Sequence, residues 1–370
     1  MSKQSKVKEP LFHIARRKGL SQPVAWGYRI GSVAAALIVC AVVIVAFTGE
    51  NPLGVYKSIF EGAVGTSRRI WGTLQNLAML LCVSLAVTPA FKMKFWNLGA
   101  EGQVLIGGLA TAMCMMYFGN SLPTPVLMIV MVAVSMLAGA VWAVIPAVFK
   151  ALWNTNESLF TLMMNYIAIQ LVSYFCLVKA VPAGSGQIGI INSTTNAGWF
   201  PTLFNQPYFV NVVIVALLTV VMYIYLKYSK HGYEISVVGE SENTARYIGI
   251  NVKKVIIRTL ILSGALCGIA GLLLVGGTDH TITRDTAAGR GFTAIMVSWL
   301  GKFNPIYMVL TSFIIVFLQK GSISVATEFG LNTAFSDIIT GIIIFFIIGS
   351  EFFINYKVIF NKKHKEVESK

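Results

Sequence analysis

The sequence predicts an all-α polytopic membrane protein with about ten transmembrane helices. Of its 370 residues, 56% are hydrophobic and only 12% are charged, and the mean hydropathy is +0.72. A soluble domain typically carries about 25% charged residues. Apolar runs of about 17 to 25 residues, each long enough to cross a hydrocarbon core of about 30 Å, recur along the chain.

The apolar runs divide the chain into three parts. Residues 1–27 form a basic N-terminal tail, residues 28–354 a transmembrane domain, and residues 355–370 a basic C-terminal tail. One long hydrophilic loop, 228–254, interrupts the transmembrane domain. Short or broken helices are expected as well, because the eighth run is brief. The predicted spans are 28–48, 70–90, 95–118, 124–149, 158–179, 207–227, 255–277, 288–301, 303–320 and 336–354.

Lysine and arginine placement predicts the orientation of these spans. If the N-terminal tail is cytoplasmic, an even number of crossings returns the C-terminus to the same side, and the inner connections then carry most of the basic residues, as positive-inside topology requires. The net charge of +14 follows from this distribution, so no nucleic-acid partner is expected. The few basic residues on the outer side are Lys57, Arg68, Arg69, Lys179, Arg284, Arg290 and Lys320.

Motifs of soluble enzymes are missing from the sequence. There is no phosphate-binding loop, no H-E-x-x-H and no G-x-S-x-G. The five cysteines all fall inside predicted spans without metal-binding spacing and are interpreted as small core residues. We therefore expect no catalytic residue, no metal and no cofactor bound by this chain, and any ATP hydrolysis to occur on another chain.

A buried charge is predicted at the head of the third span, in FWNLGAEGQVLIGG (95–108). Asn97, Glu101 and Gln103 lie there among glycines, and a carboxylate at membrane depth is costly unless it is paired, hydrated or interfacial. Two interpretations stay open. Glu101 caps and anchors a helix at the inner surface, or this segment is a polar element of a translocation path.

A second charge between glycines is Arg290, in AAGRGFTAIMVSWLG (287–301). The third and eighth spans run in opposite directions, so the two motifs occupy equivalent places in halves of opposite orientation. This pattern is typical of an inverted repeat with interrupted helices, which transporters use to build a site near the membrane midplane. If both breaks reach the midplane, Glu101 and Arg290 approach each other.

Further polar residues within spans either face a solute or tie neighbouring helices together. The segment ESLFTLMMNYIA (157–168), with Asn165, is the richest of these. Gly264 and Gly268, four residues apart, instead predict a close helix contact. The other polar residues of this kind are Gln75, Asn76, Tyr166, Gln170 and Ser173.

The hydrophilic loop 228–254 contains helix signals of its own. Ser241 is a candidate N-cap, Glu242 and Asn243 follow it, and a short helix through Tyr247 would end at Gly249. One interpretation is a docking element for a soluble partner, and the other is an ordinary solvated loop.

Taken together, these segments resemble the integral permease subunits of nucleoside-importing ATP-binding-cassette (ABC) systems. That group belongs to a broader family with ribose and branched-chain amino acid permeases, and the likeness covers about residues 51–350. In this family the loop pattern GE-x(4)-AR-x-x-GI is taken to dock on the ATPase subunit. The resemblance assigns that role to Gly239, Glu240, Ala245, Arg246, Gly249 and Ile250, with Glu234 as a further acidic residue of the loop.

The resemblance also implies partners and a mechanism. An ABC ATPase subunit that binds ATP and Mg would drive the loop, and a second permease subunit would complete a heterodimer. An extracytoplasmic substrate-binding lipoprotein would deliver a small molecule and would face the outer loop 181–207. The candidate path residues are Asn97, Glu101, Gln103, Asn165 and Arg290. The alternatives are a ribose-like sugar permease, a secondary transporter driven by an ion gradient, and a membrane scaffold.

Overall fold

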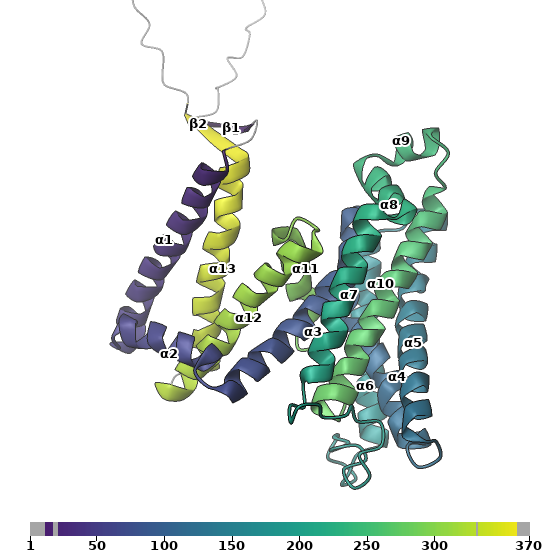
Figure 1. Ribbon diagram of the computed structural model, residues 1–370. Coiled ribbons are helices and arrows are strands. Elements are labelled where there is room, and N and C mark those ends of the chain that lie inside the picture. The colour runs from purple at the N-terminus through teal and green to yellow at the C-terminus, as the bar shows by residue number, and fades with distance from the viewer. Residues whose placement is uncertain (1–11, 18–20, 331, 361–370) are drawn as a thin grey trace, which may run out of the picture. The chain divides into compact units, whose positions relative to one another are not determined.

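The computed structural model describes residues 12–17, 21–330 and 332–360, and it is almost entirely helical (Figure 1). Each of the ten predicted spans coincides with a helix. The helices are α1 (Gln22–Thr48), α2 (Pro52–Val64), α3 (Ser67–Lys92), α4 (Ala100–Phe118), α5 (Thr124–Trp153), α6 (Glu157–Val178), α7 (Phe209–Tyr228), α8 (Lys230–Glu240), α9 (Glu242–Tyr247), α10 (Val252–Leu274), the π-helical turn η1 (Val275–Asp279), α11 (Arg290–Leu300), α12 (Pro305–Glu328) and α13 (Thr333–Asn355).

The predicted fold class is confirmed. Within the described residues, 8 helices are long and apolar enough to cross a membrane. The two remaining predicted spans correspond to α4, with 19 residues, and α11, with 11. At 1.5 Å per residue α11 is about 16 Å long, roughly half of a hydrocarbon core. It is therefore a half-helix and does not cross the membrane by itself.

The chain forms two compact units, and the first combines its two ends (Met1–Ala63 with Leu318–Lys370). In this unit α1 packs against α13. Strand β1 (Phe12–Arg16) pairs with β2 (Tyr356–Phe360) in an antiparallel register, and Arg29 forms an ion pair with Glu351 at 2.6 Å. The two tails thus meet at one end of the unit. Neither these strands nor α2 was predicted, because the tails were interpreted only as basic extensions and residues 49–69 only as a connection between two spans.

The second unit (Val64–Phe317) is a helical bundle around α10 and holds the candidate site. Helix α10 packs against α3, α4 and α5. A Cβ on Gly264 would lie 2.3 Å from the Gly139 carbonyl oxygen, and one on Gly268 would lie 2.1 Å from the Ser135 carbonyl oxygen. The predicted close contact at Gly264 and Gly268 is therefore confirmed, and it is made with α5.

The two ends of this bundle differ. Helices α8 and α9 lie at one end, and the loop between α6 and α7 lies at the opposite end (Figure 1). This separation agrees with the prediction that loops 228–254 and 181–207 are on opposite sides of the membrane.

The start of α4 corrects the prediction for the third span. The helix begins at Ala100, five residues later than expected, and residues 95–97 have no regular structure. Lys94 has a φ of 61°, and the Asn97 Oδ1 accepts a hydrogen bond from the Gly99 backbone N–H (3.1 Å). The left-handed residue and this side-chain cap keep the segment out of a helix.

Candidate functional site

The hydrophilic loop folds into two short helices. Ser229 caps α8 by accepting a hydrogen bond from the Gly232 N–H (2.9 Å), and Ser241 caps α9 by accepting one from the Thr244 N–H (3.2 Å). Gly249 has a φ of 84°, a conformation that favours glycine and that follows the end of α9. The predicted short helix is thus present, whereas α8 was not predicted.

Helix α8 packs directly against the end of α3. Its buried face carries Ile235 and Val238, which join a cluster of buried side chains with Met93 and Phe95. A Cβ on Gly239 would lie only 2.1 Å from the Lys92 carbonyl oxygen, so the backbones touch there. Gly239 is therefore required for this packing.

An ion pair ties α8 to α10. The Arg258 guanidinium donates a hydrogen bond to the Glu234 Oε2 at 2.7 Å, and both side chains are largely buried. This hydrogen bond, more than any other influence, lowers the pKa of Glu234 from its ordinary value. No local pattern predicts this pair, because Arg258 lies 24 residues further along the chain.

The surface of α9 points away from the bundle. Ala245 is fully buried and fixes the helix, whereas Tyr247 is 92% exposed and Ile248 is 51% exposed. Arg246 is exposed and forms an ion pair with Glu242 at 3.3 Å. We call the exposed residues Glu240, Arg246, Tyr247 and Ile248 the α9 surface. An exposed tyrosine beside an arginine and an aliphatic residue is typical of a protein-binding surface.

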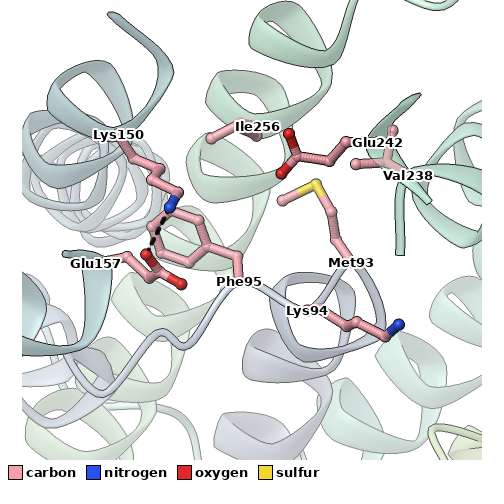
Figure 2. Close-up of a pocket in the computed structure, with 8 residues that line it drawn as sticks. All are labelled: Met93, Lys94, Phe95, Lys150, Glu157, Val238, Glu242 and Ile256. Carbon is pink, nitrogen blue, oxygen red and sulfur yellow. Dashed lines mark ion pairs between the residues drawn. The ribbon is translucent and has the colours of Figure 1, made fainter. Parts of the chain in front are cut away.

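A small pocket lies beside α9, between it and the connections α3–α4 and α5–α6 (Figure 2). Lys150 and Glu157 form an ion pair across the α5–α6 connection at 2.9 Å, and both side chains are mostly buried. This ion pair fixes the α5–α6 connection at the end of the bundle where α9 lies. The lining residues are Met93, Lys94, Phe95, Lys150, Glu157, Val238, Glu242 and Ile256.

Three of the candidate path residues brace the irregular segment before α4. The Asn97 Nδ2 donates to Ser263 Oγ (3.3 Å), and the Gln103 Nε2 donates to Asn97 Oδ1 (3.2 Å). Asn165 accepts a hydrogen bond from the Gly102 N–H (2.8 Å) and donates one to the Leu98 carbonyl oxygen (2.7 Å). All three side chains are buried. Asn97 and Asn165 pair with backbone groups of this irregular segment and of the first turn of α4, and Gln103 holds the Asn97 amide in place.

The side chain of Glu101 contacts the backbone on both sides of Arg290. The two carboxylate oxygens of Glu101 accept hydrogen bonds from the N–H groups of Gly289 and Gly291, each at 2.7 Å. These groups lie at the start of α11, where unpaired amides favour a negative charge. The predicted approach of the two glycine-flanked motifs is therefore present, with the carboxylate of one motif bound by the helix start of the other.

The Arg290 side chain extends in another direction. Its guanidinium donates to Asn76 Oδ1 (3.1 Å) and to the carbonyl oxygens of Thr286 (3.3 Å) and Ala287 (3.4 Å). Across the described ranges, no ion pair joins it to Glu101. The positive charge is instead held against α3 by neutral acceptors.

Comparison with known proteins identifies relatives over nearly the whole chain. The family model described as "Branched-chain amino acid transport system / permease component" matches residues 70–348. The glucose ABC transporter permease protein of Haloferax volcanii is 31% identical over 346 residues, which cover 90% of each chain.

Two further relatives carry nucleoside names. The nucleoside ABC transporter permease protein NupB of Lactococcus lactis is 28% identical over 319 residues, 83% of this chain and 86% of that one. The guanosine ABC transporter permease protein NupP of Bacillus subtilis is 27% identical over 334 residues, 87% of this chain and 91% of that one. No solved structure matches.

Proposed function

Because this chain belongs to the family of permease components of branched-chain amino acid transport systems, we propose that it forms a path for nucleosides and is driven through its α9 surface. The chain is a multi-pass membrane protein and a permease component of an ABC importer. Its substrate, its docking surface and its orientation are the proposed parts.

The α9 surface is the observation that carries the docking proposal. Its base is fixed by buried Ala245, by Gly239 against α3 and by the Glu234–Arg258 ion pair, so a force applied to α9 reaches α3 and α10. A helix that is held rigidly at its base and exposes an aromatic side chain is suited to bind a partner subunit and to transmit that subunit's movement. We assign the partner as an ATPase subunit that holds ATP and Mg.

The relatives support a nucleoside substrate, because two of those described above carry nucleoside or guanosine in their names. A sugar is the second candidate, because the glucose permease protein of Haloferax volcanii is 31% identical over 90% of both chains. Both substrate classes are uncharged or weakly charged rings that carry several hydroxyl groups.

The remaining proposals concern the assembly. A second permease subunit would complete the path as a heterodimer, and an extracytoplasmic substrate-binding lipoprotein would deliver the solute. Both termini are assigned to the cytoplasm, and the β1–β2 pairing supports placing them on one side. Along the path we assign Glu101 and Arg290 to a junction between the start of α4 and the half-helix α11, with Asn97, Gln103 and Asn165 shaping the path beside it.

The test is nucleoside uptake by the complete transporter carrying Arg246→Glu together with Tyr247→Ala. We expect loss of uptake and of substrate-stimulated ATP hydrolysis, with both permease chains still present in the membrane, because these side chains are exposed and contribute little to folding. Tyr174→Ala, a change at a tyrosine that is 68% exposed on α6, is the matched control. Normal uptake by the double variant would refute the docking assignment.

The same assay separates the rival mechanisms. An importer driven by ATP stops when ATP is depleted and continues when ion gradients are collapsed. A secondary transporter shows the opposite behaviour, and a scaffold shows no change in uptake with any α9 variant. Competition by unlabelled glucose or ribose distinguishes a sugar permease from a nucleoside permease.

A further inference from the structure

A second polar network lies where α3, α7 and η1 meet, at the end of the bundle opposite to α8 and α9. The Gln75 side chain donates a hydrogen bond to the Thr278 hydroxyl, and the Asn211 Nδ2 donates to Gln75 Oε1 (3.3 Å) and to Thr278 Oγ1 (3.3 Å). Gln75 and Asn211 are buried, and the Asn211 Oδ1 has no hydrogen-bond partner within the described part of the chain. Leaving this acceptor unpaired is costly, and it is enclosed against Gly277, where an added Cβ would lie 2.3 Å from it.

Asp279 adds a free carboxylate next to this network. It follows Thr278 in η1, its side chain is exposed, and within the described ranges it makes no hydrogen bond or ion pair. It interacts electrostatically with Arg290, whose guanidinium is fixed on Asn76. Charged side chains at membrane level face a bundle interior or a water-filled cavity, where they mark solute pathways. A π-helical turn is also frequent at functional sites.

Aromatic rings border the same region. Trp71 lies four residues before Gln75, on the same face of α3. Its ring centroid is 6.2 Å from that of Phe209, two residues before Asn211, and the Phe209 ring is 5.0 Å from that of Phe204. Phe204 is 82% exposed, and the other two rings are partly exposed. The polar network therefore has an aromatic border one helical turn away.

From this arrangement we propose that Asp279, Arg290, Gln75, Asn211 and Thr278, with the ring of Trp71, form a recognition site for a ring solute that carries neighbouring hydroxyl groups. A carboxylate accepts hydrogen bonds from two hydroxyls at once, as acidic residues do with ribose hydroxyls in dinucleotide-binding folds. An aromatic face stacks on a base or packs against a sugar ring. Arg290, which is positioned by Asn76, supplies a donor for the remaining oxygens.

This inference rests on the proposed function and adds the substrate group that is recognised. Of the site residues, Arg290 is among the candidate path residues predicted from sequence, and Gln75 is among the polar span residues for which a solute-facing role was left open. The site also differs from the irregular segment before α4, where Asn97, Gln103 and Asn165 already have partners within the protein.

The experiment is equilibrium binding of radiolabelled adenosine to the complete transporter in nanodiscs, without the delivering protein and without ATP. Wild type should bind adenosine, and 2′,3′-dideoxyadenosine should compete at least about tenfold less well, since a lost hydrogen bond to a charged group is worth about 1.5–3 kcal/mol and 1.4 kcal/mol is tenfold. Asp279→Asn should weaken adenosine binding by at least about tenfold and remove most of the discrimination between the two compounds.

Three further variants keep the test decisive. Asp279→Glu retains the charge and should restore part of the affinity, and Trp71→Leu should weaken binding without changing the preference for hydroxyl groups. Asp285→Asn, at a nearby carboxylate that is 82% exposed, is the matched control and should bind as wild type does. Wild-type affinity and selectivity in Asp279→Asn would overturn the inference.

Two other results separate this inference from the proposed function. If wild type transports adenosine but binds neither adenosine nor glucose in nanodiscs, the recognition site is refuted and the transport function stands. If adenosine is neither bound nor transported but glucose is both bound and transported, the nucleoside assignment fails. In that case the hydroxyl site stands only if Asp279→Asn weakens glucose binding to the same extent.

Discussion

Replacing Gly239 with alanine tests whether α8 is held against α3 by backbone contact. The added Cβ would lie 2.1 Å from the Lys92 carbonyl oxygen, whereas ordinary contacts begin at 3.4 Å, so the two backbones must separate by about 1.3 Å. The obstructing atom belongs to the backbone and cannot rotate away. The shift would loosen Ile235 and Val238, which are 0% and 4% exposed in the packed helix.

Overpacking of this kind costs about 1–3 kcal/mol. We expect a lower midpoint of thermal unfolding for the purified transporter, and less ATP hydrolysis in response to substrate, because α9 is carried on the displaced helix. Gly31→Ala is the matched control: nothing lies within 4 Å of its added Cβ. If Gly239→Ala unfolds at the wild-type temperature and couples normally, the packing argument is refuted.

Three further predictions concern single interactions. Glu101→Gln should lower the unfolding temperature, because an amide retains only one acceptor oxygen for the Gly289 and Gly291 N–H groups. Each hydrogen bond to a charged group is worth about 1.5–3 kcal/mol. An unchanged unfolding temperature would contradict the assignment of these hydrogen bonds. Asn165→Leu should cost about 1–3 kcal/mol by leaving the buried Gly102 N–H without its acceptor, which hydrogen exchange at Gly102 can detect as lost protection. The pKa of Glu234 is lowered in the folded protein, so its stabilising contribution is present above the unfolded pKa of about 4.3 and is lost as the pH falls through the folded pKa. Acidification below about pH 4.3 should therefore destabilise wild type more than Glu234→Gln, and parallel curves of unfolding temperature against pH would argue against the Arg258 pair.

The helices could be predicted from sequence because apolar runs of membrane-spanning length are a strong and local signal. The α9 helix could also be predicted, because Ser241 and Gly249 mark its two ends within nine residues. The start of α4 could not, because the hydrogen bonds that keep residues 95–99 irregular come partly from Asn165 and Ser263, far along the chain.

The candidate site was predictable in part. Glycines around Glu101 and Arg290 indicated two special helix starts, but which atoms would meet depended on the tertiary arrangement. Glu101 and Arg290 were expected to approach each other, and the structure shows that the contact is made by the backbone of Gly289 and Gly291, while the Arg290 guanidinium contacts Asn76. Gln75 could be singled out as a polar residue within a span, but its partners Asn211 and Thr278 lie on distant segments of mostly apolar sequence, so no local pattern marks the network.

The central claim is that this chain is a permease component moved by a separate ATPase. Uptake into proteoliposomes tests it most directly, with this chain reconstituted either alone or with its second permease, ATPase and delivering protein. We predict uphill accumulation of adenosine only in the complete assembly and only with ATP on the ATPase side. Uphill accumulation by this chain alone, driven by an ion gradient, would contradict the account.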